Sequence, residues 1–249
     1  MIKTLDGKIA LVTGGSSGIG TAIVQSFAQA GAHVAFTYHS NKEGAEAVLA
    51  EIEAMGVKGA YFQADMADFA KAQEVVDQVN EKFSTLDILV NNAGANQDKV
   101  VWKMTETMWD EVIDTDLKGV FNYIRAASPN FREKKYGRII TVSSINALRG
   151  KFGQSNYAAA KAGVIGLSKS VAKELGRSNV TVNVVCPGLI ATKMIQSMPD
   201  DFKEKAMKEI VLGRIGTPED VAEVITFLSG DGAKHITGEV IKVDGGQYI

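Results

Sequence analysis

Short apolar runs of strand length alternate along this chain with longer segments whose apolar residues recur at helical spacing. The predicted strands are Ile9–Val12, His33–Tyr38, Gly59–Ala64, Leu86–Asn91, Arg138–Val142, Val180–Val185 and Glu239–Val243. The predicted helices are a segment through Ile23, Phe27 and Ala30, then Lys42–Met55, Asp68–Phe83, Glu106–Phe131, Asn156–Gly176 and Pro218–Leu228. Such alternation is typical of a parallel sheet with helices on both faces. We therefore expect an α/β fold in which about seven strands form a doubly wound parallel sheet.

Composition narrows the class of protein. The 249 residues carry 27 Lys+Arg and 29 Asp+Glu, a formal net charge of −2, which argues against a nucleic-acid clamp. The single cysteine, Cys186, excludes an internal disulfide, and three histidines leave no Cys/His cluster at zinc-ligand spacing. No stretch rich in proline, serine or one sign of charge divides the chain. We expect a single domain over residues 1–249, cytoplasmic and without a metal.

The stretch Ile9–Asn41 contains no Asp, Glu, Lys or Arg, which raises the question of a signal peptide or membrane span. Glycines interrupt its apolar run, two glutamines follow, and acidic Asp6 precedes it. We therefore expect neither a signal peptide nor a membrane segment.

The loop after the first predicted strand is rich in glycine. It reads Thr13-Gly14-Gly15-Ser16-Ser17-Gly18-Ile19-Gly20, between a strand and a helix. Glycines at this spacing allow a tight turn, close approach of a diphosphate to the backbone, and close packing of the helix on the strand. The N-terminus of the following helix would then face the phosphates. A glycine-rich turn without a ligand remains the alternative.

The second predicted strand ends without an acidic residue. Tyr38, His39, Ser40 and Asn41 are followed by Lys42. A carboxylate at this point favours NAD, because it binds the ribose hydroxyls, whereas a 2′-phosphate requires its absence. The sequence therefore favours NADP(H) over NAD(H), although Lys42 is equally consistent with the solvated first turn of a helix.

Tyr157 and Lys161 lie four residues apart, so that they share one face of the predicted helix. A tyrosine, with a pKa of about 10, becomes a useful acid near neutral pH only where a cation stabilises its phenolate. Alone, the pair is also explained by a solvated lysine beside a half-buried tyrosine.

Five motifs in order give the chain its resemblance to a known family. They are the glycine loop, Asn91-Asn92-Ala93-Gly94, Ser144 thirteen residues before Tyr157, Lys161, and Pro187-Gly188. Together they resemble the short-chain dehydrogenase/reductase family over essentially the whole chain. The stretch Phe152–Gly163, with Asp98 and Lys103-Met104-Thr105, is most similar to 3-oxoacyl-acyl-carrier-protein reductases and acetoacetyl-CoA reductases.

The resemblance implies a Rossmann-like sheet and hydride transfer between a nicotinamide and a carbonyl carbon, without a metal. Tyr157 would act as acid/base, with Ser144 hydrogen-bonding the carbonyl oxygen and Lys161 lowering the pKa of Tyr157. The implied catalytic set is Ser144, Tyr157, Lys161 and Asp116. The implied cofactor-binding residues are Gly14, Ser16, Ser17, Gly18, Ile19, Gly20, Tyr38, His39, Asp65, Met66, Asn92, Ala93, Gly94, Tyr157, Lys161, Pro187, Gly188, Ile190 and Thr192. The candidate substrate-binding residues are Ser144, Gln154, Tyr157, Lys103 and Gly188.

Asp116 departs from the family pattern, which normally has Asn at this position to hold a water that relays protons to the lysine. An ionised Asp accepts from that water but cannot donate, and its charge would raise the pKa of Lys161. Our hypothesis is a surviving relay with an altered pH dependence; a tolerated surface substitution is the alternative.

The sequence leaves the substrate open. NADPH-dependent reduction of a 3-oxoacyl thioester is favoured over action on another secondary alcohol, a sugar or a steroid, and over a non-catalytic dinucleotide-binding regulator. Lys103, Arg149, Lys151 and the cluster Arg132, Lys134 and Lys135 would suit a phosphopantetheine phosphate or an acyl carrier protein, or are solvated charges. The apolar segment Thr192–Leu212 is a candidate lid or ordinary packing. The family resemblance further implies a homotetramer.

Overall fold

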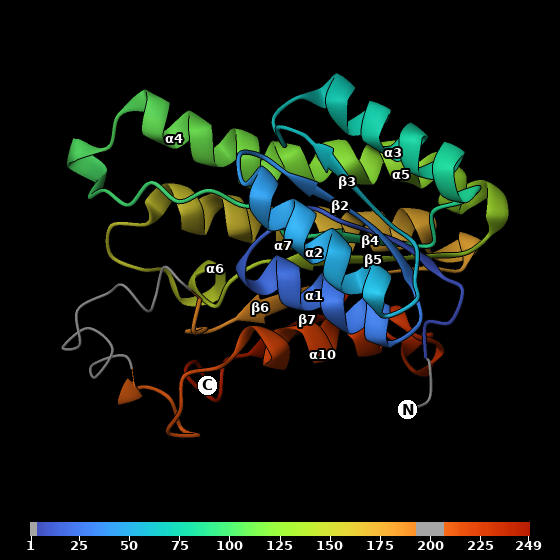
Figure 1. The fold of residues 1–249 in the computed structure, drawn as a ribbon. Helices are drawn as coiled ribbons and strands as arrows, with labels where there is room; N and C mark the ends of the chain where they lie inside the picture. Colours follow the sequence, from blue (N-terminus) through green and yellow to red (C-terminus); the bar gives the residue numbers. More distant parts are fainter. Residues whose placement is uncertain (1–3, 193–206) are drawn as a thin grey trace.

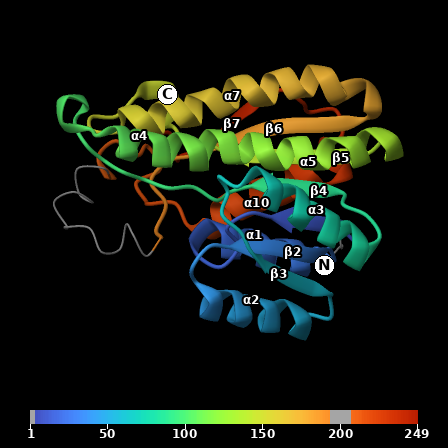
Figure 2. The same cartoon turned by 90° about the horizontal axis from the view of Figure 1, so that it is seen from above.

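The computed structural model describes residues 4–192 and 207–249, and a seven-stranded parallel sheet runs through its centre (Figures 1 and 2). The strands are β1 Ile9–Val12, β2 His33–Tyr38, β3 Gly59–Gln63, β4 Ile88–Asn91, β5 Gly137–Val142, β6 Val180–Pro187 and β7 Val240–Val243. Their order across the sheet is β3-β2-β1-β4-β5-β6-β7, and every neighbouring pair is parallel. The predicted doubly wound sheet is confirmed.

Helices cover both faces of the sheet (Figure 2). One face carries α1 Gly18–Gln29, α2 Lys42–Ala54 and α10 Pro218–Ser229, whose buried side chains, such as Phe27 and Ile52, join those of the sheet in one apolar core. The other face carries α3 Phe69–Phe83, α5 Gly119–Lys134 and α7 Ser155–Leu175, which form a second core. β1, in the interior of the sheet, is buried on both faces, which explains why its sequence is continuously apolar.

The predicted single helix Glu106–Phe131 is wrong in detail. The structure has α4 Glu106–Ile113, a π-helical turn Asp114–Lys118, and then α5. At the end of the turn the Gly119 N–H donates to the Asp114 carbonyl five residues earlier, where an α-helix would bond four residues back. Apolar spacing over such a long segment does not reveal one extra residue. The turn buries Asp116 completely.

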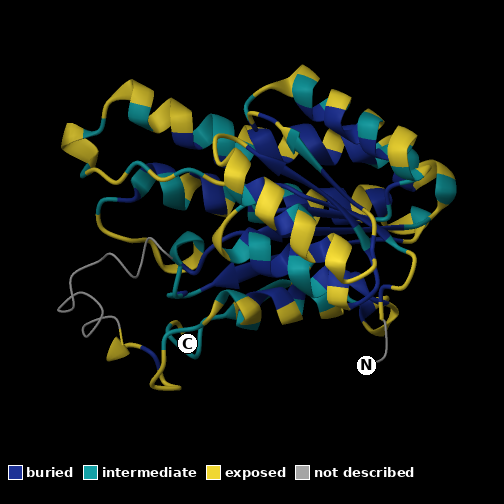
Figure 3. Ribbon diagram, viewed as in Figure 1, coloured by how far each residue is buried: buried dark blue, intermediate teal, exposed yellow. Residues whose placement is uncertain are grey.

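Several elements differ from the sequence prediction only at their ends. β4 begins at Ile88, two residues later than the predicted start at Leu86. Just before the strand, the Asp87 carboxylate accepts a hydrogen bond from the Ile9 N–H at 2.9 Å. The short helix α6 Asn146–Arg149 was not predicted, since a single turn is too short for a periodic signal. Exposed surfaces concentrate on the outer faces of the helices (Figure 3). Within the described residues, no helix is long and apolar enough to cross a membrane.

The strand order reverses between β1 and β4, so that the loops after these strands separate at the carboxyl edge of the sheet. A crevice at such a point is where open α/β sheets bind ligands. The packing there is close: a Cβ at Gly20 would lie 2.0 Å from the Gly14 carbonyl oxygen and 2.7 Å from Asn92 Nδ2. Glycine at position 20 therefore lets α1 begin directly beside both loops.

We expect Gly20→Ala to lower the free energy of unfolding by about 1–3 kcal/mol, because backbone must shift to admit the methyl group. Urea denaturation at fixed protein concentration measures the change. Gln29→Ala is the matched control, since Gln29 lies exposed on the same helix and its change should stay within about 0.5 kcal/mol. Equal stability of the two variants would contradict the packing argument.

Candidate active site

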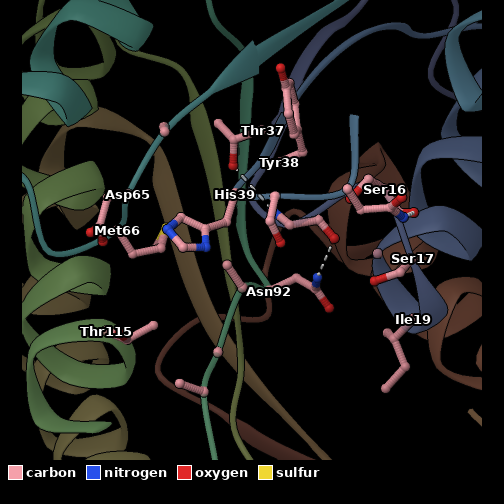
Figure 4. A pocket seen from close by; sticks show the side chains of 18 of the residues that line it. Ser16, Ser17, Ile19, Thr37, Tyr38, His39, Asp65, Met66, Asn92 and Thr115 are labelled. Atoms are coloured by element: carbon pink, nitrogen blue, oxygen red, sulfur yellow. Dashed lines mark hydrogen bonds between the residues drawn. The ribbon is translucent and has the colours of Figure 1, made fainter. Parts of the chain in front are cut away.

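A cavity of about 570 Å³ lies at the carboxyl edge of the sheet, where the chain order reverses (Figure 4). Its walls come from the glycine loop and the start of α1, and from the residues that follow β2, β3 and β4. Its lining consists of Gly14, Ser16, Ser17, Ile19, Gly20, Thr37, Tyr38, His39, Ser40, Asn41, Ala64, Asp65, Met66, Asn92, Ala93, Gly94, Ala95, Glu111, Thr115 and Thr192. The size and the mixed polar lining suit an elongated nucleotide.

Hydrogen bonds fix the glycine loop against its neighbours. Gly14 adopts φ +69°, a conformation that favours glycine, and its N–H donates to Thr37 Oγ1 at 3.1 Å. Thr13 Oγ1 accepts from the Asn92 N–H at 3.0 Å and from the Ala93 N–H at 3.1 Å. In return, Asn92 Nδ2 donates to the carbonyls of Thr13 at 3.0 Å and Gly14 at 3.2 Å. The loops after β1 and β4 are thus joined into one rigid rim.

The backbone of the glycine loop and the start of α1 are suited to bind a diphosphate. A Cβ at Gly14 would lie 2.9 Å from Ala93 Cα, so a side chain there has no room between the two loops. Ser17 precedes α1 in extended conformation and its side chain does not cap the helix. Among the described residues, no side chain accepts from the first N–H groups of α1 at the cavity wall, which leaves these groups available to a phosphate.

The end of β2 presents hydroxyl, imidazole and amide groups to the cavity. None of the residues from Tyr38 to Asn41 is acidic, and Asn41 Nδ2 donates to the Ser16 carbonyl at 3.0 Å, tying this loop to the glycine loop. Lys42 does not line the cavity; it forms an exposed ion pair with Glu46 at 3.6 Å. Asp65, after β3, accepts from the Ala67 N–H at 2.9 Å.

A second group of residues, the Tyr157 cluster, consists of Ser144, Tyr157, Lys161 and Asp116. Ser144 follows β5, Tyr157 and Lys161 lie in the first two turns of α7, and Asp116 lies in the π-helical turn. Lys161 Nζ donates to the Val142 carbonyl at 3.2 Å, lies 3.1 Å from Asp116 Oδ2 and 5.6 Å from the centre of the Tyr157 ring. The structure therefore brings together the four predicted catalytic residues.

The environment of Tyr157 perturbs its acidity in opposing directions. Burial of the hydroxyl raises the pKa of Tyr157, and Lys161 lowers it. Asp116 raises the pKa again, a hydrogen bond with Ser144 lowers it, and Asp98 adds a small increase. The net pKa of Tyr157 is raised above its ordinary value, so the free chain holds this residue in its protonated form near neutral pH.

Lys161 is buried, with only 4% of its surface exposed. Burial lowers its pKa, but the Asp116 carboxylate, and also Tyr157, raise the pKa by more, so that it ends above its usual range. Lys161 is thus a permanent cation at neutral pH.

Gly94 connects the Tyr157 cluster with the cavity. It lines the cavity, and a Cβ at this position would lie 3.2 Å from Lys161 Nζ and 3.0 Å from Asp116 Oδ2. One end of a ligand in the cavity would therefore reach the ammonium group. Cavity and cluster form one continuous candidate active site.

Most of the predicted cofactor residues line the cavity. Those outside its lining are Gly18, Tyr157, Lys161, Pro187, Gly188 and Ile190. Lining residues outside the predicted cofactor-binding set are Thr37, Ser40, Asn41, Ala64, Ala95, Glu111 and Thr115, although Ser40 and Asn41 lie in the segment that predicted NADP(H). Ser40, Asn41 and Ala95 directly extend predicted motifs and could have been found in this way, whereas Glu111 and Thr115 reach the site only through the packing of α4 and the π-helical turn.

Gln154, a candidate substrate residue, is buried and already bonded. Its Nε2 lies 3.0 Å from both carboxylate oxygens of Asp98, and its Oε1 accepts from Asn146 Nδ2 at 3.0 Å. Asn156 similarly donates to the carbonyls of Gln97 at 3.1 Å and Met108 at 3.0 Å. These amides fix the loops on either side of Ser144 and Tyr157, which the sequence reasoning did not foresee.

Other candidate residues lie elsewhere. Lys103 ends an exposed 3₁₀ turn, Val101–Lys103, outside the cavity lining, and Gly188 packs against Asp244. Arg149 forms an ion pair with Glu209 at 2.9 Å, and Lys151 also has an interaction partner. Of the candidate lid Thr192–Leu212, residues 193–206 lie outside the described part.

The predicted basic cluster Arg132, Lys134 and Lys135 lies at the wrong end of the sheet for a role in the site. Lys134 Nζ donates to the Leu86 carbonyl and forms an ion pair with Asp87 at 2.7 Å, just before β4 begins. Its contacts therefore fasten the C-terminus of α5 to the amino edge of the sheet, opposite the cavity.

Comparisons with known proteins agree with this architecture. Residues 14–247 match the family described as enoyl-(acyl carrier protein) reductase. The 3-oxoacyl-acyl-carrier-protein reductase FabG of Staphylococcus aureus strain N315 is 46% identical over 97% of this chain and 98% of the relative. The protein of the same name from Thermotoga maritima is 43% identical over 98% of this chain and 99% of its own length.

A crystal structure of a candidate short-chain alcohol dehydrogenase from Sinorhizobium meliloti superposes with a TM-score of 0.95 at 34% identity, covering 99% of this chain and 98% of that one. The resemblance predicted from the motifs is confirmed. The chain belongs to the short-chain dehydrogenase/reductase family of oxidoreductases.

Proposed function

We propose that this protein reduces the 3-keto group of a 3-oxoacyl thioester to a 3-hydroxyacyl thioester with NADPH. The observation that carries the proposal is the Tyr157 cluster, in which a protonated tyrosine and a buried lysine adjoin a nucleotide-sized cavity through Gly94. The relatives named 3-oxoacyl-acyl-carrier-protein reductase support the thioester as the substrate class.

As a member of its family, the chain uses a nicotinamide dinucleotide, which supplies a hydride when bound. The glycine loop and the start of α1 would hold the diphosphate, and the residues after β2, β3 and β4 the adenosine. None of the described residues that line the cavity is Lys or Arg, so neutral donors such as Ser40 and Asn41 would hold a 2′-phosphate. The absence of an acid from Tyr38 to Asn41 supports NADPH.

The Tyr157 cluster can supply the proton that ketone reduction consumes. The Tyr157 hydroxyl gives its proton to the ketone oxygen as that oxygen gains negative charge, and the Ser144 hydroxyl donates a hydrogen bond to the same oxygen. Lys161 then stabilises the phenolate left on Tyr157 and binds the ribose next to the nicotinamide. The proton returns from solvent before the next turnover.

Carrier, assembly and location complete the proposal. The acyl group is carried on acyl carrier protein, as the names of the relatives indicate for those proteins, with CoA as a simpler carrier for assays. We propose a homotetramer in the cytoplasm. Exposed aromatic side chains on α4 and α5, Trp109 and Phe121, support packing of these helices against another copy.

Tyr157→Phe is expected to lower the rate of NADPH oxidation with acetoacetyl-CoA about 10²- to 10⁴-fold, because the proton donor is removed. The decrease in NADPH absorbance at 340 nm measures the rate. Tyr136→Phe is the matched control, since Tyr136 directly precedes β5, at the amino edge of the sheet, and its rate should match that of the parent.

Two results would contradict the proposal. If the parent reduces only ketones, sugars or steroids that are not thioesters, the substrate class is wrong. If it binds NADPH and reduces no carbonyl compound, the chain is a regulator that has kept the fold.

His39→Asp is expected to lower kcat/KM for NADPH about tenfold or more relative to NADH, because it places a carboxylate where the 2′-phosphate would bind. Parallel assays with both cofactors measure the ratio. His235→Asp introduces the same charge at an exposed position outside the cavity and should leave the ratio unchanged. A parent that prefers NADH would contradict the assignment of NADPH.

A further inference from the structure

Asp116 is a fully buried carboxylate in the π-helical turn. Its Oδ1 accepts a hydrogen bond from the Ala95 N–H at 2.6 Å, which fixes the side chain against the loop after β4. Apart from Lys161, whose ammonium lies 3.1 Å from Asp116 Oδ2, no described residue donates a hydrogen bond to this oxygen. One carboxylate oxygen thus binds the backbone, and the other forms an ion pair with Lys161, the lysine next to Tyr157.

The charge of Lys161 acts on both the Asp116 carboxylate and Tyr157. The ammonium is 3.1 Å from Asp116 Oδ2 and 5.6 Å from the centre of the Tyr157 ring. Since an ion pair at this distance in a buried site is little screened by water, the negative charge of Asp116 offsets part of the attraction that Lys161 would exert on a phenolate.

The other groups that face this cluster are few. Ser144 hydrogen-bonds to Tyr157 from the loop after β5, and Asp98 acts on Tyr157 from the loop after β4. Cys186 on β6 raises the pKa of Lys161. Asp244, after β7, raises the pKa of Cys186. Of the carboxylates, Asp116 alone makes a direct ion pair with Lys161, so its charge dominates the local balance among the described groups.

Tyr157 and Lys161 are coupled, so the first proton that leaves belongs to the pair. Asp116 raises the pKa of both members, since it opposes a phenolate on Tyr157 and favours an ammonium on Lys161. Without this carboxylate, burial would favour a neutral lysine and the lysine would favour a phenolate. Whichever group loses the first proton, the loss would occur at lower pH.

We propose that Asp116 is a positioning residue that keeps both protons on the Tyr157–Lys161 pair to higher pH and so sustains carbonyl reduction under alkaline conditions. The inference rests on the proposed function, because reduction consumes the Tyr157 proton. The reverse reaction requires the phenolate, so alcohol oxidation is correspondingly confined to higher pH.

The test compares the parent with Asp116→Asn across pH. Asn keeps the size of the side chain and an oxygen that can accept from the Ala95 N–H, but removes the charge. With saturating NADPH and acetoacetyl-CoA, we expect the alkaline fall in kcat to move down by about one pH unit or more. For 3-hydroxybutyryl-CoA and NADP, the rise in the oxidation rate should move down by a similar amount.

Asp114→Asn is the matched control. Asp114 lies in the same π-helical turn, but its side chain is 46% exposed and pairs with Lys118 at 3.4 Å, so its profile should coincide with that of the parent. Coincident profiles for Asp116→Asn and the parent would overturn the inference, as would an upward shift.

A second measurement does not depend on turnover of a thioester. NMR of protein labelled with ¹³Cζ-tyrosine and ¹³Cε-lysine, assigned with Tyr157→Phe and Lys161→Met, follows both groups directly. We expect the first of the two to titrate at lower pH in Asp116→Asn; unchanged titration would overturn the inference. Absence of thioester reduction by the parent together with this shift would refute the proposed substrate while leaving the role of Asp116 intact.

Discussion

The hydrogen bonds between Thr13 and Asn92 are the constraint on which the site depends. They join the loops after β1 and β4, the two strands between which the order of the sheet reverses. A crevice between diverging loops would otherwise be free to widen. Because one threonine hydroxyl accepts two backbone N–H groups and one amide returns two bonds, the glycine loop and the approach to Lys161 keep a fixed separation.

The same edge of the sheet solves two opposite electrostatic problems. In the cavity, the chain offers neutral donors and a helix N-terminus to a multiply charged ligand. In the Tyr157 cluster, it buries a lysine, a group that is seldom fully buried without a partner. The partner is Asp116, and Gly94 lies beside both, where no side chain larger than a hydrogen fits without displacing the pair. Only the backbone of Gly94 therefore lies between the nucleotide cavity and the buried Lys161–Asp116 pair.

The parts predicted from sequence were those with a local signal. β1 and β2 have the predicted bounds, because buried parallel strands read as apolar runs. Ser144, Tyr157 and Lys161 are proposed as a set because several motifs in order resemble those of a known family, whereas the spacing of Tyr157 and Lys161 alone is also explained by a solvated lysine. What failed depended on three-dimensional packing. The alternative that Asp116 is a surface residue is wrong, since the π-helical turn buries it, and the basic residues near Lys134 lie at the far edge because α5 runs the whole length of the sheet.

The π-helical turn also fixes the rotational phase between α4 and α5. An α-helix advances about 100° per residue, so one additional residue in a turn rotates everything after it by about that angle relative to everything before it. Loss of a single residue from Asp114–Lys118 would therefore join α4 and α5 into one regular helix. In that helix, the faces of α4 and α5 that now pack against the protein could not both keep their positions. The number of residues between α4 and α5 is therefore fixed by the packing of both helices. An insertion or deletion here would disturb the fold far more than one in an exposed loop.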